Sequence, residues 1–427
     1  MRIANVLALA ALVAVLGACA GAPPPPKVEV VQVREETAEE LFGKGLKALE
    51  AKDYAAAKDS LTKAVAKDPK LADAHFDLGI LAELEGDLPG AQGAYEAALA
   101  AEPKHRGAIL NLGRIYRLRG ELDKAANLYV GALQENEFDV DYNNNLAVIY
   151  RLQKKYEPAV AALRKLLSRT PKNPEAYKNL GVIYLDQGNL RLAEFVLAEA
   201  KKLDDQDAGV YNNLGIIYMK NDDRRAALGA FRKAVDLDPA CYACNMNVGA
   251  VALSFRDYTA AAASFGKATE LEPNNFEGHL NRGFALMGAK KKQDAQAAFE
   301  KVLQLRPGHG EALFNLAELH YGDPKGLEKA KELFTQYLTL GAEATRRQAA
   351  EQRLTLIEMK LKNPPAPPVE EKPKETPTEA KDVGDMGFIE QAVGDAAEEG
   401  EVVPAEGEAA PAEGAEAAPA PEAPAAE

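Results

Sequence analysis

Seven asparagines recur along the chain at a constant spacing of 34 residues. They are Asn111, Asn145, Asn179, Asn213, Asn247, Asn281 and Asn315. A fixed period of this length is typical of a solenoid, in which each unit packs only against its neighbours, and it argues against a single globular core. The spacing also places the same side chain on the same face of every unit. Solenoids bind partners along such extended concave faces.

Small and large apolar residues keep the same period. In the sixth unit they are Gly215, Ala227 and Phe231, followed by Pro239. A glycine inside a helix costs about 1 kcal/mol relative to alanine, so its recurrence needs a packing reason. Close approach of two antiparallel helices supplies that reason, and the proline ends the second helix of the unit.

This order of residues resembles the tetratricopeptide repeat, a helix-turn-helix unit. Asn111-Leu-Gly-Arg-Ile-Tyr116 and Asn213-Leu-Gly-Ile-Ile-Tyr218 match its motif. The resemblance covers residues 37–342 and implies an all-α, right-handed α-solenoid of about nine repeats. The ninth unit departs from the motif at Gly322-Asp323-Pro324. We expect residues 343–362 to form a C-terminal cap helix, because terminal repeats need a polar outer face.

Residues 1–18 predict a lipoprotein signal peptide. Arg2 precedes an apolar stretch, residues 6–16, which is too short to span a bilayer comfortably. The stretch ends in Leu16-Gly17-Ala18-Cys19, which resembles a bacterial lipobox. That resemblance implies lipidation of Cys19 and, because no aspartate follows, a place on the periplasmic face of the outer membrane. An ordinary secretory signal with an incidental cysteine is the alternative. If Cys19 is lipidated, residues 19–36 form a lipidated tether.

The excess negative charge lies at the C-terminus. Residues 364–427 contain 17 acids and 3 bases, so the other 48 acids and 48 bases balance. Residues 363–427 are rich in Pro, Ala and Glu and predict a disordered acidic tail. Its apolar island, residues 386–393, could dock on a partner or be merely less polar than its surroundings. No long basic run indicates a nucleic-acid partner.

The asparagines are candidate peptide-binding residues on the first helix of each unit. An amide both donates and accepts hydrogen bonds, so a row of amides can pair with an extended backbone. Alternatively, each amide bonds to the neighbouring repeat. Arg114, Arg117 and Arg151 form a basic cluster suited to an acidic segment, and Val182 and Ile216 begin an apolar stretch. Arginines that are solvated and bind no partner are the competing interpretation.

Cys241 and Cys244 are the other candidates for chemistry. In an oxidising compartment they could form a disulfide. A reduced inert pair and a redox or metal site are the alternatives, although the chain lacks the βαβ setting of thioredoxin-like proteins. The five histidines form no cluster with metal-ligand spacing, and no catalytic arrangement is recognisable. We therefore expect no enzyme activity, no cofactor and no metal.

Three functional hypotheses follow. The first is an outer-membrane-anchored periplasmic scaffold or assembly factor for an envelope machine, similar to type IV pilus pilotin-like or gliding-motility tetratricopeptide lipoproteins. Its partner would be a protein or an extended peptide segment of the complex, with the membrane reached through the lipid. The second is a regulator of a cell-wall enzyme, and the third is a periplasmic CxxC redox protein.

Overall fold

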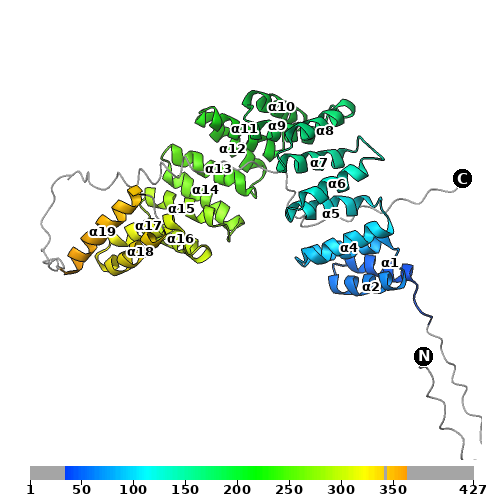
Figure 1. Ribbon diagram of the computed structural model, residues 1–427, viewed down its shortest axis with the longest axis horizontal. Helices are drawn as coiled ribbons and strands as arrows, with labels where there is room; N and C mark the ends of the chain where they lie inside the picture. Colours follow the sequence, from blue (N-terminus) through cyan, green and yellow to red (C-terminus); the bar gives the residue numbers. More distant parts are fainter. Residues whose placement is uncertain (1–33, 341–343, 363–427) are drawn as a thin grey trace, which may run out of the picture.

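The computed structural model describes residues 34–340 and 344–362, and this part of the chain contains nineteen α-helices, one short 3-10 helix and no strand (Figure 1). The predicted signal peptide with Cys19, most of the predicted tether and the predicted tail from residue 363 lie outside the described residues. Along the described chain, the helices form consecutive antiparallel pairs. We call the first helix of each pair the A helix and the second the B helix.

Nine pairs follow one another along the chain. The A helices are α1 (Ala38–Glu50), α3 (Ala72–Leu84), α5 (Arg106–Leu118), α7 (Val140–Leu152), α9 (Pro174–Asp186), α11 (Ala208–Lys220), α13 (Tyr242–Ser254), α15 (Phe276–Gly288) and α17 (Gly310–Tyr321). The B helices are α2 (Tyr54–Lys67), α4 (Leu88–Ala101), α6 (Leu122–Ala132), α8 (Tyr156–Arg169), α10 (Leu190–Leu203), α12 (Arg224–Leu237), α14 (Tyr258–Leu271), α16 (Lys292–Leu305) and α18 (Leu327–Thr339). The predicted all-α solenoid is confirmed.

The recurring glycines lie where the two helices of a pair approach most closely. A Cβ atom on Gly249 of α13 would lie only 2.6 Å from Cε1 of Phe265 on α14. Phe265 is 1% exposed and Ala261, one turn earlier, is fully buried. The glycine is therefore required by the ring that packs against it, as the sequence period predicts. In the fourth unit alanine occupies this register, and Ala147 lies in one buried cluster with Leu163 of α8.

The turn between the two helices of a pair also repeats. In eight of the nine turns one residue adopts a positive φ, for example Gly120 at 71° and Lys154 at 58°. Glycine adopts this left-handed conformation without steric cost, whereas a lysine pays a modest penalty. Five turns nevertheless use a residue other than glycine. The strain is small enough for helix packing on both sides to outweigh it.

The ninth pair is irregular, as its sequence predicts. A 3-10 helix, η1 (Pro324–Gly326), stands between α17 and α18 and shifts the core residues by one position. Ala330 and Phe334 are still fully buried. The last helix, α19 (Ala344–Lys362), packs against α18 and buries Ile357. It is the predicted C-terminal cap helix.

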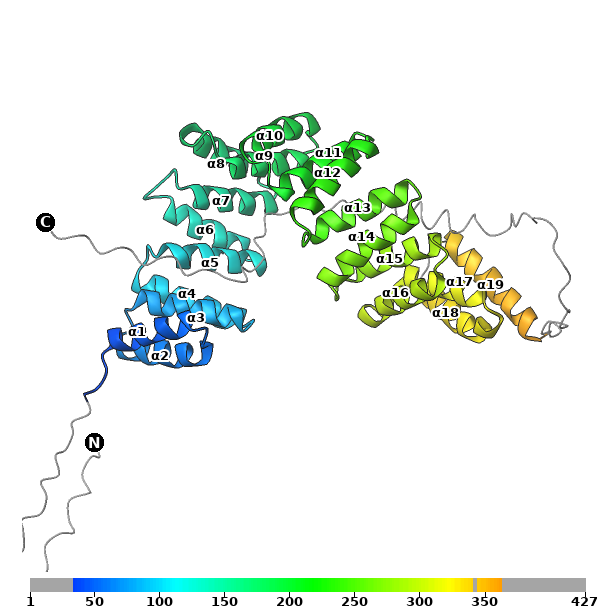
Figure 2. The same cartoon turned by 180° about the vertical axis from the view of Figure 1, so that it is seen from behind.

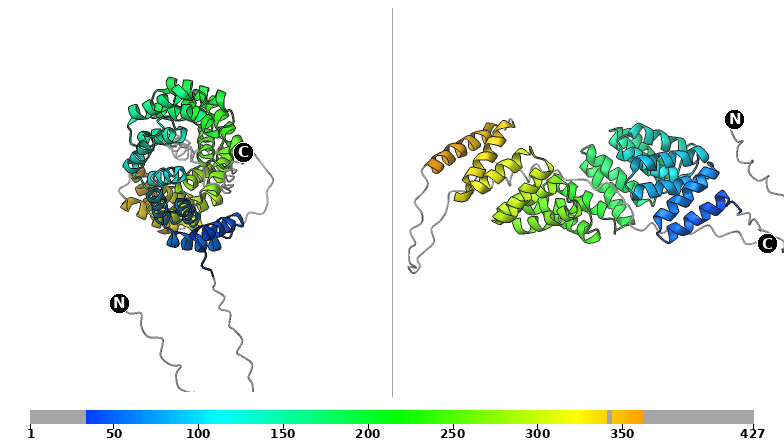
Figure 3. Two further views of the ribbon diagram at one scale, coloured as in Figure 1. Left: turned by 90° about the vertical axis from the view of Figure 1, so that its right-hand side faces the viewer. Right: turned by 90° about the horizontal axis from the view of Figure 1, so that it is seen from below.

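The pairs stack in chain order into an elongated superhelix (Figure 2). Seen end-on, the helices wind around a common axis, with the earliest and latest pairs at opposite ends of the array (Figure 3). Within residues 34–340 and 344–362, none of the helices combines the length and hydropathy needed to cross a bilayer. The stacking leaves one continuous surface to which successive A helices contribute side by side, and we call it the A-helix face.

Candidate binding groove

A hollow of about 440 Å³ lies on the A-helix face. All of its lining residues come from three consecutive A helices, α5, α7 and α9. They are Arg117, Val140, Asp141, Asn144, Asn145, Val148, Arg151, Glu175, Lys178, Asn179 and Val182. The structure therefore brings together five residues that the sequence singled out, Arg117, Asn145, Arg151, Asn179 and Val182. We call this hollow the central pocket.

Lys178 is the most enclosed cation of the central pocket. Lys178 is only 8% exposed. Its Nζ lies 2.8 Å from Oδ2 of Asp207 and 2.9 Å from Oε2 of Glu175. Burial alone would lower the pKa of Lys178, but the attraction of Glu175 and Asp207 outweighs burial and raises the pKa above its usual value. Lys178 thus stays charged and spans the junction between α9 and the start of α11.

The arginines of the pocket connect neighbouring repeats. Arg151 on α7 pairs with Asp186 at the end of α9, with Nη1 to Oδ2 at 3.0 Å. Asp141, near the start of α7, pairs with Arg106 of α5. The lining contains three cations and two carboxylates. Arg151 and Lys178 are already paired with carboxylates of neighbouring positions, so the lining is held in place by ion pairs between repeats.

Arg114 does not line the central pocket. It pairs with Glu83 of the preceding repeat, and the same carboxylate accepts a hydrogen bond from Tyr95 Oη at 2.6 Å. Burial, together with that hydrogen bond, raises the pKa of Tyr95 well above its ordinary range. Asn111 Nδ2 donates to the same hydroxyl at 3.1 Å. Arg114 and Asn111 thus belong to one network that joins neighbouring repeats.

Like Asn111, two further asparagines of the ladder bond to the neighbouring repeat, which is the alternative left open by the sequence. Asn179 Nδ2 donates to Asn144 Oδ1 at 3.2 Å, and Asn247 Nδ2 donates to Asn212 Oδ1 at 2.9 Å. Both acceptors, Asn144 and Asn212, stand one residue before a ladder asparagine, Asn145 and Asn213. These amides tie successive A helices together at the A-helix face.

The other ladder residues differ in environment. Asn145 and Asn315 donate to backbone oxygens one turn earlier, at 2.9 Å and 2.8 Å, and Asn281 is half-buried on α15. Asn213 is fully buried, and its amide has no hydrogen-bond partner among the described residues. Peptide binding by the whole ladder stays a prediction, and Asn145 is the member with the most favourable place for it, at the edge of the central pocket.

The apolar stretch expected in the middle of the groove is largely closed. Ile216 on α11 is 3% exposed, and it packs in a cluster with Leu185 of α9 and Val248 of α13. Val182 is 5% exposed but still lines the central pocket. Because the A helices of this segment fill the face with their own side chains, Ile216 offers little surface to a ligand in this conformation.

Sequence reasoning did not single out Lys178 or Asn144. Both occupy the register just before the ladder asparagines, 34 residues apart. A comparison of that register along the chain would have signalled them, because it holds apolar residues in most other units, such as Leu110 and Leu280. Their ion pair and amide bond could not be inferred, since both depend on how consecutive A helices are offset.

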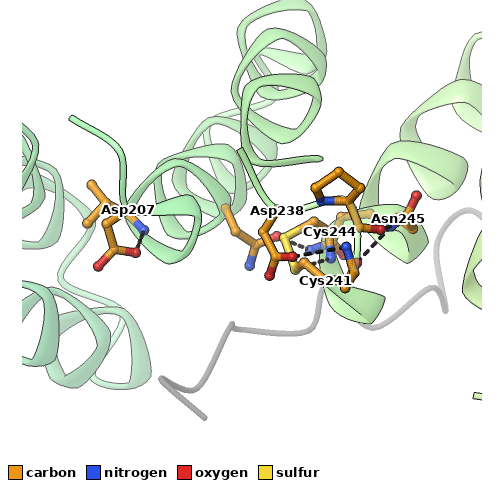
Figure 4. Close-up of a disulfide and its surroundings, with 10 residues drawn as sticks. Asp207, Asp238, Cys241, Cys244 and Asn245 are labelled. Atoms are coloured by element: carbon orange, nitrogen blue, oxygen red, sulfur yellow. Dashed lines mark hydrogen bonds between the residues drawn. A yellow bond between two sulfur atoms is a disulfide. The ribbon is translucent and has the colours of Figure 1, made fainter. Parts of the chain in front are cut away.

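Cys241 and Cys244 form a disulfide at the start of α13, with Cα atoms 5.3 Å apart (Figure 4). Cys241 is the N-cap residue of α13, and its Sγ accepts a hydrogen bond from the Cys244 amide at 3.0 Å. Most other A helices are capped here by an oxygen or imidazole nitrogen, as by Asp139 in α7. Cys244 is fully buried. The disulfide closes the first turn of α13 and makes no contact with the central pocket lining.

No group of three or more potential metal ligands lies among the residues that the structure describes. The central pocket offers hydrogen-bond donors, acceptors, charges and two valines, which suits recognition of an extended chain better than bond cleavage. Its volume of about 440 Å³ lies within the range of ligand-binding pockets.

Models of the tetratricopeptide repeat match residues 42–105, 82–149, 174–207, 212–276 and 276–309, and a model described as TPR repeat matches residues 148–188. Together they extend over most of the helical array. The chain therefore belongs to the tetratricopeptide repeat proteins, a family of protein-interaction scaffolds. No curated protein matches the sequence.

Solved structures with a similar fold include three repeat proteins. YrrB, described as a TPR protein with an unusual peptide-binding site, is 21% identical, with a TM-score of 0.36 over 44% of this chain and 97% of its own. PilF of Pseudomonas aeruginosa is 22% identical, with a TM-score of 0.44 over 50% and 97%. The APC/C hetero-tetramer Cut9-Hcn1 is 17% identical, with a TM-score of 0.48 over 68% of this chain and 57% of its own. These likenesses concern the fold alone.

Proposed function

We propose that the protein is a scaffold that holds an extended segment of a protein partner in the central pocket. The observation that carries the proposal is the pocket itself, about 440 Å³ in volume and lined by three consecutive A helices. Asn145 and Asn144 can pair with backbone groups of such a segment, and Val148 and Val182 can contact its apolar side chains. An acidic side chain of the segment would lie near Arg117, Arg151 and Lys178.

The charge of the lining favours one kind of segment. Three cations face two carboxylates in the pocket, and both carboxylates already have cationic neighbours, Arg106 for Asp141 and Lys178 for Glu175. Because Arg151 and Lys178 are themselves paired with Asp186 and Asp207, a partner carboxylate would be attracted by cations that it shares with those side chains. Because the pocket is open to solvent, this attraction should weaken as salt concentration rises.

In this proposal the chain is a lipoprotein of the outer membrane and faces the periplasm. The support is Leu16-Gly17-Ala18-Cys19, which is similar to a lipobox, and a double or triple acyl anchor binds membranes stably. The partner would be a component of an envelope machine such as a pilus, secretin or gliding-motility complex. Mass spectrometry of the N-terminal peptide should find an acylated Cys19, and an unmodified Cys19 in the membrane fraction would exclude the anchor.

The binding claim is tested by capture from envelope membranes. The full chain should recover a partner that is lost from the triple variant Arg117→Ala, Asn145→Ala and Val148→Asp. A matched control carries the same kinds of change outside the pocket, at the exposed Arg225, Asn221 and Val130. Equal recovery by both variants would show that the pocket does not bind the partner. Circular dichroism of both variants checks that the array remains folded.

A further inference from the structure

The first three A helices carry an apolar surface at the registers that line the central pocket. Phe42, Phe76 and Leu110 occupy the register of Asn144 and Lys178. Leu46 and Ile80 occupy the register of Val148 and Val182. Since a 34-residue step moves a side chain from one A helix to the next on the same face, these residues continue the A-helix face toward the N-terminus. We call this surface the N-terminal face.

Two large apolar side chains are exposed here, Leu46 and Leu84, and Leu84 follows the half-buried Ile80 by one helical turn on α3. Leu46 is 39% exposed and Leu84, at the end of α3, is 59% exposed. At the register of Leu46 in α15, Phe284 is only 3% exposed. This position is therefore covered by neighbouring repeats in α15 and uncovered in α1. Exposed apolar patches of this kind mark interaction surfaces.

The floor of the N-terminal face is held in place. The Phe76 ring lies 5.6 Å from the ring of Tyr95 and 4.8 Å from that of His105, measured between centroids. Gly107 makes room for it, because a Cβ atom there would lie 2.7 Å from Phe76 Cζ. His105 is fixed in turn by its Nδ1, which accepts a hydrogen bond from the Ala108 amide at 3.1 Å. A partner would meet a preformed floor, which lowers the entropic cost of binding.

Charge on this part of the array is negative. Residues 34–105 contain 15 acids and 9 bases, whereas residues 106–169 contain 7 acids and 11 bases. On the face itself, Glu39 and Asp73 occupy the register of the pocket carboxylates Asp141 and Glu175. Both are exposed, and the Asp73 side chain is 73% exposed although His105 Nε2 lies 3.0 Å from it. The apolar floor thus has an acidic border, the opposite of the central pocket.

We propose that the N-terminal face is a second docking surface, which takes a cationic amphipathic segment of a protein partner. Large apolar side chains of that segment would cover Leu46, Ile80 and Leu84, and its lysines or arginines would lie near Glu39 and Asp73. The acidic tail of this chain, with 17 acids and 3 bases, has the wrong charge for this border. The proposal does not depend on what the central pocket binds.

Titration of labelled peptides into the full chain tests the assignment by fluorescence anisotropy. The probe is a short amphipathic peptide of leucine and lysine, compared with one in which glutamate replaces lysine and one in which serine replaces leucine. We expect the leucine-lysine peptide to bind at least about tenfold more tightly than either comparison peptide. The variant Leu46→Ser with Leu84→Ser should lose about tenfold in affinity. Glu39→Gln with Asp73→Asn should lose about threefold, and less at high salt.

Two controls locate the binding. Leu192→Ser with Phe195→Ser removes equally exposed apolar side chains from α10, at 43% and 63% exposure, and should leave affinity unchanged. Arg117→Ala with Asn145→Ala alters the central pocket and should also leave it unchanged. Equal loss in the α10 variant, or equal binding of the leucine-glutamate peptide, would overturn the proposal. So would sedimentation showing that the wild-type chain self-associates through Leu46 and Leu84, since the face would then belong to a second copy.

Discussion

The A-helix face has two contrasting segments built on one register. Across α5, α7 and α9 it is open, polar and charged, with Asn144, Arg151 and Lys178 around a hollow of about 440 Å³. From α11 to α15 the same registers hold residues such as Ile216 and Phe284, each 3% exposed. The backbone repeat is the same in both segments. The difference therefore arises from a few side chains, which determine whether neighbouring A helices cover each other or leave space for a ligand.

Truncation of a side chain in the closed segment should have the largest effect on stability. Phe284 packs edge-on against Phe299, with ring centroids 5.6 Å apart. Phe284→Ala should cost about 4 kcal/mol in free energy of unfolding, because it leaves a cavity between repeats. Val148→Ala, at the corresponding register of the open segment, should cost less than about 1 kcal/mol. Denaturant unfolding of both variants measures the contrast, and equal losses would show that the open segment is as tightly packed as the closed one.

A second contrast concerns the asparagine register itself, which holds Asp77 in the second repeat. Burial raises the pKa of Asp77 to about 6, and the charge of Asp73 adds to the shift. Because the folded pKa exceeds the unfolded value of 3.8, the protonated carboxyl stabilises the fold at low pH. That contribution is lost as pH rises through about 6. Asp77→Asn cannot ionise and should be more stable than wild type by up to about 3 kcal/mol at pH 7.

Thermal unfolding of wild type and Asp77→Asn from pH 4 to pH 7 checks this prediction. The two melting temperatures should be close at pH 4 and separate as pH increases. A constant difference across the range would mean that Asp77 does not change its protonation with pH. Asp59→Asn, at an exposed position on α2, serves as the control.

The ion pairs of Lys178 should contribute a smaller amount. Lys178→Ala leaves the carboxylates of Glu175 and Asp207 without their shared cation, and we expect a loss of about 2 kcal/mol. The double variant Lys178→Ala with Asp207→Ala should recover part of the loss, because fewer charges remain unpaired. A double-mutant cycle by denaturant unfolding gives the coupling. Additive losses would show that the two side chains do not interact.

The smallest expected difference in free energy of unfolding is between variants at two asparagines of the ladder, Asn247 and Asn213. Asn247→Ala removes the donor to Asn212 and should cost about 1 kcal/mol. Asn213→Ala removes an amide that has no hydrogen-bond partner in the described part of the chain, so it should cost less than Asn247→Ala. Parallel unfolding curves provide the comparison. A larger loss at Asn213 would indicate that its amide makes a stabilising contact.

The sequence period was sufficient to predict the fold. Gly249 and Phe265 keep fixed places in their unit, so the close approach of two helices could be inferred from the sequence alone. The departure at residues 322–324 also indicated the irregular ninth pair. Local spacing determines these features, because each unit packs mainly within itself and against its neighbours.

The candidate site was only partly predictable. Spacing correctly grouped Arg117, Asn145 and Arg151 on one face, but it could not show that Ile216 on that face is covered. Coverage depends on the offset between consecutive A helices and on the volume of side chains in three repeats. For the same reason, the amide bond from Asn179 to Asn144 and the ion pair of Lys178 with Asp207 became visible only in the structure.

Site-specific photo-crosslinking tests the central claim most directly. A photoreactive phenylalanine analogue replaces Val148 in the central pocket, Met287 in the closed segment, or Leu192 on the exposed side of α10. After irradiation of envelope membranes, the analogue at Val148 should yield a covalent adduct with one protein partner, and the other two positions should not. Adducts of equal yield at all three positions, or an adduct at Met287 alone, would contradict the assignment of binding to the open segment.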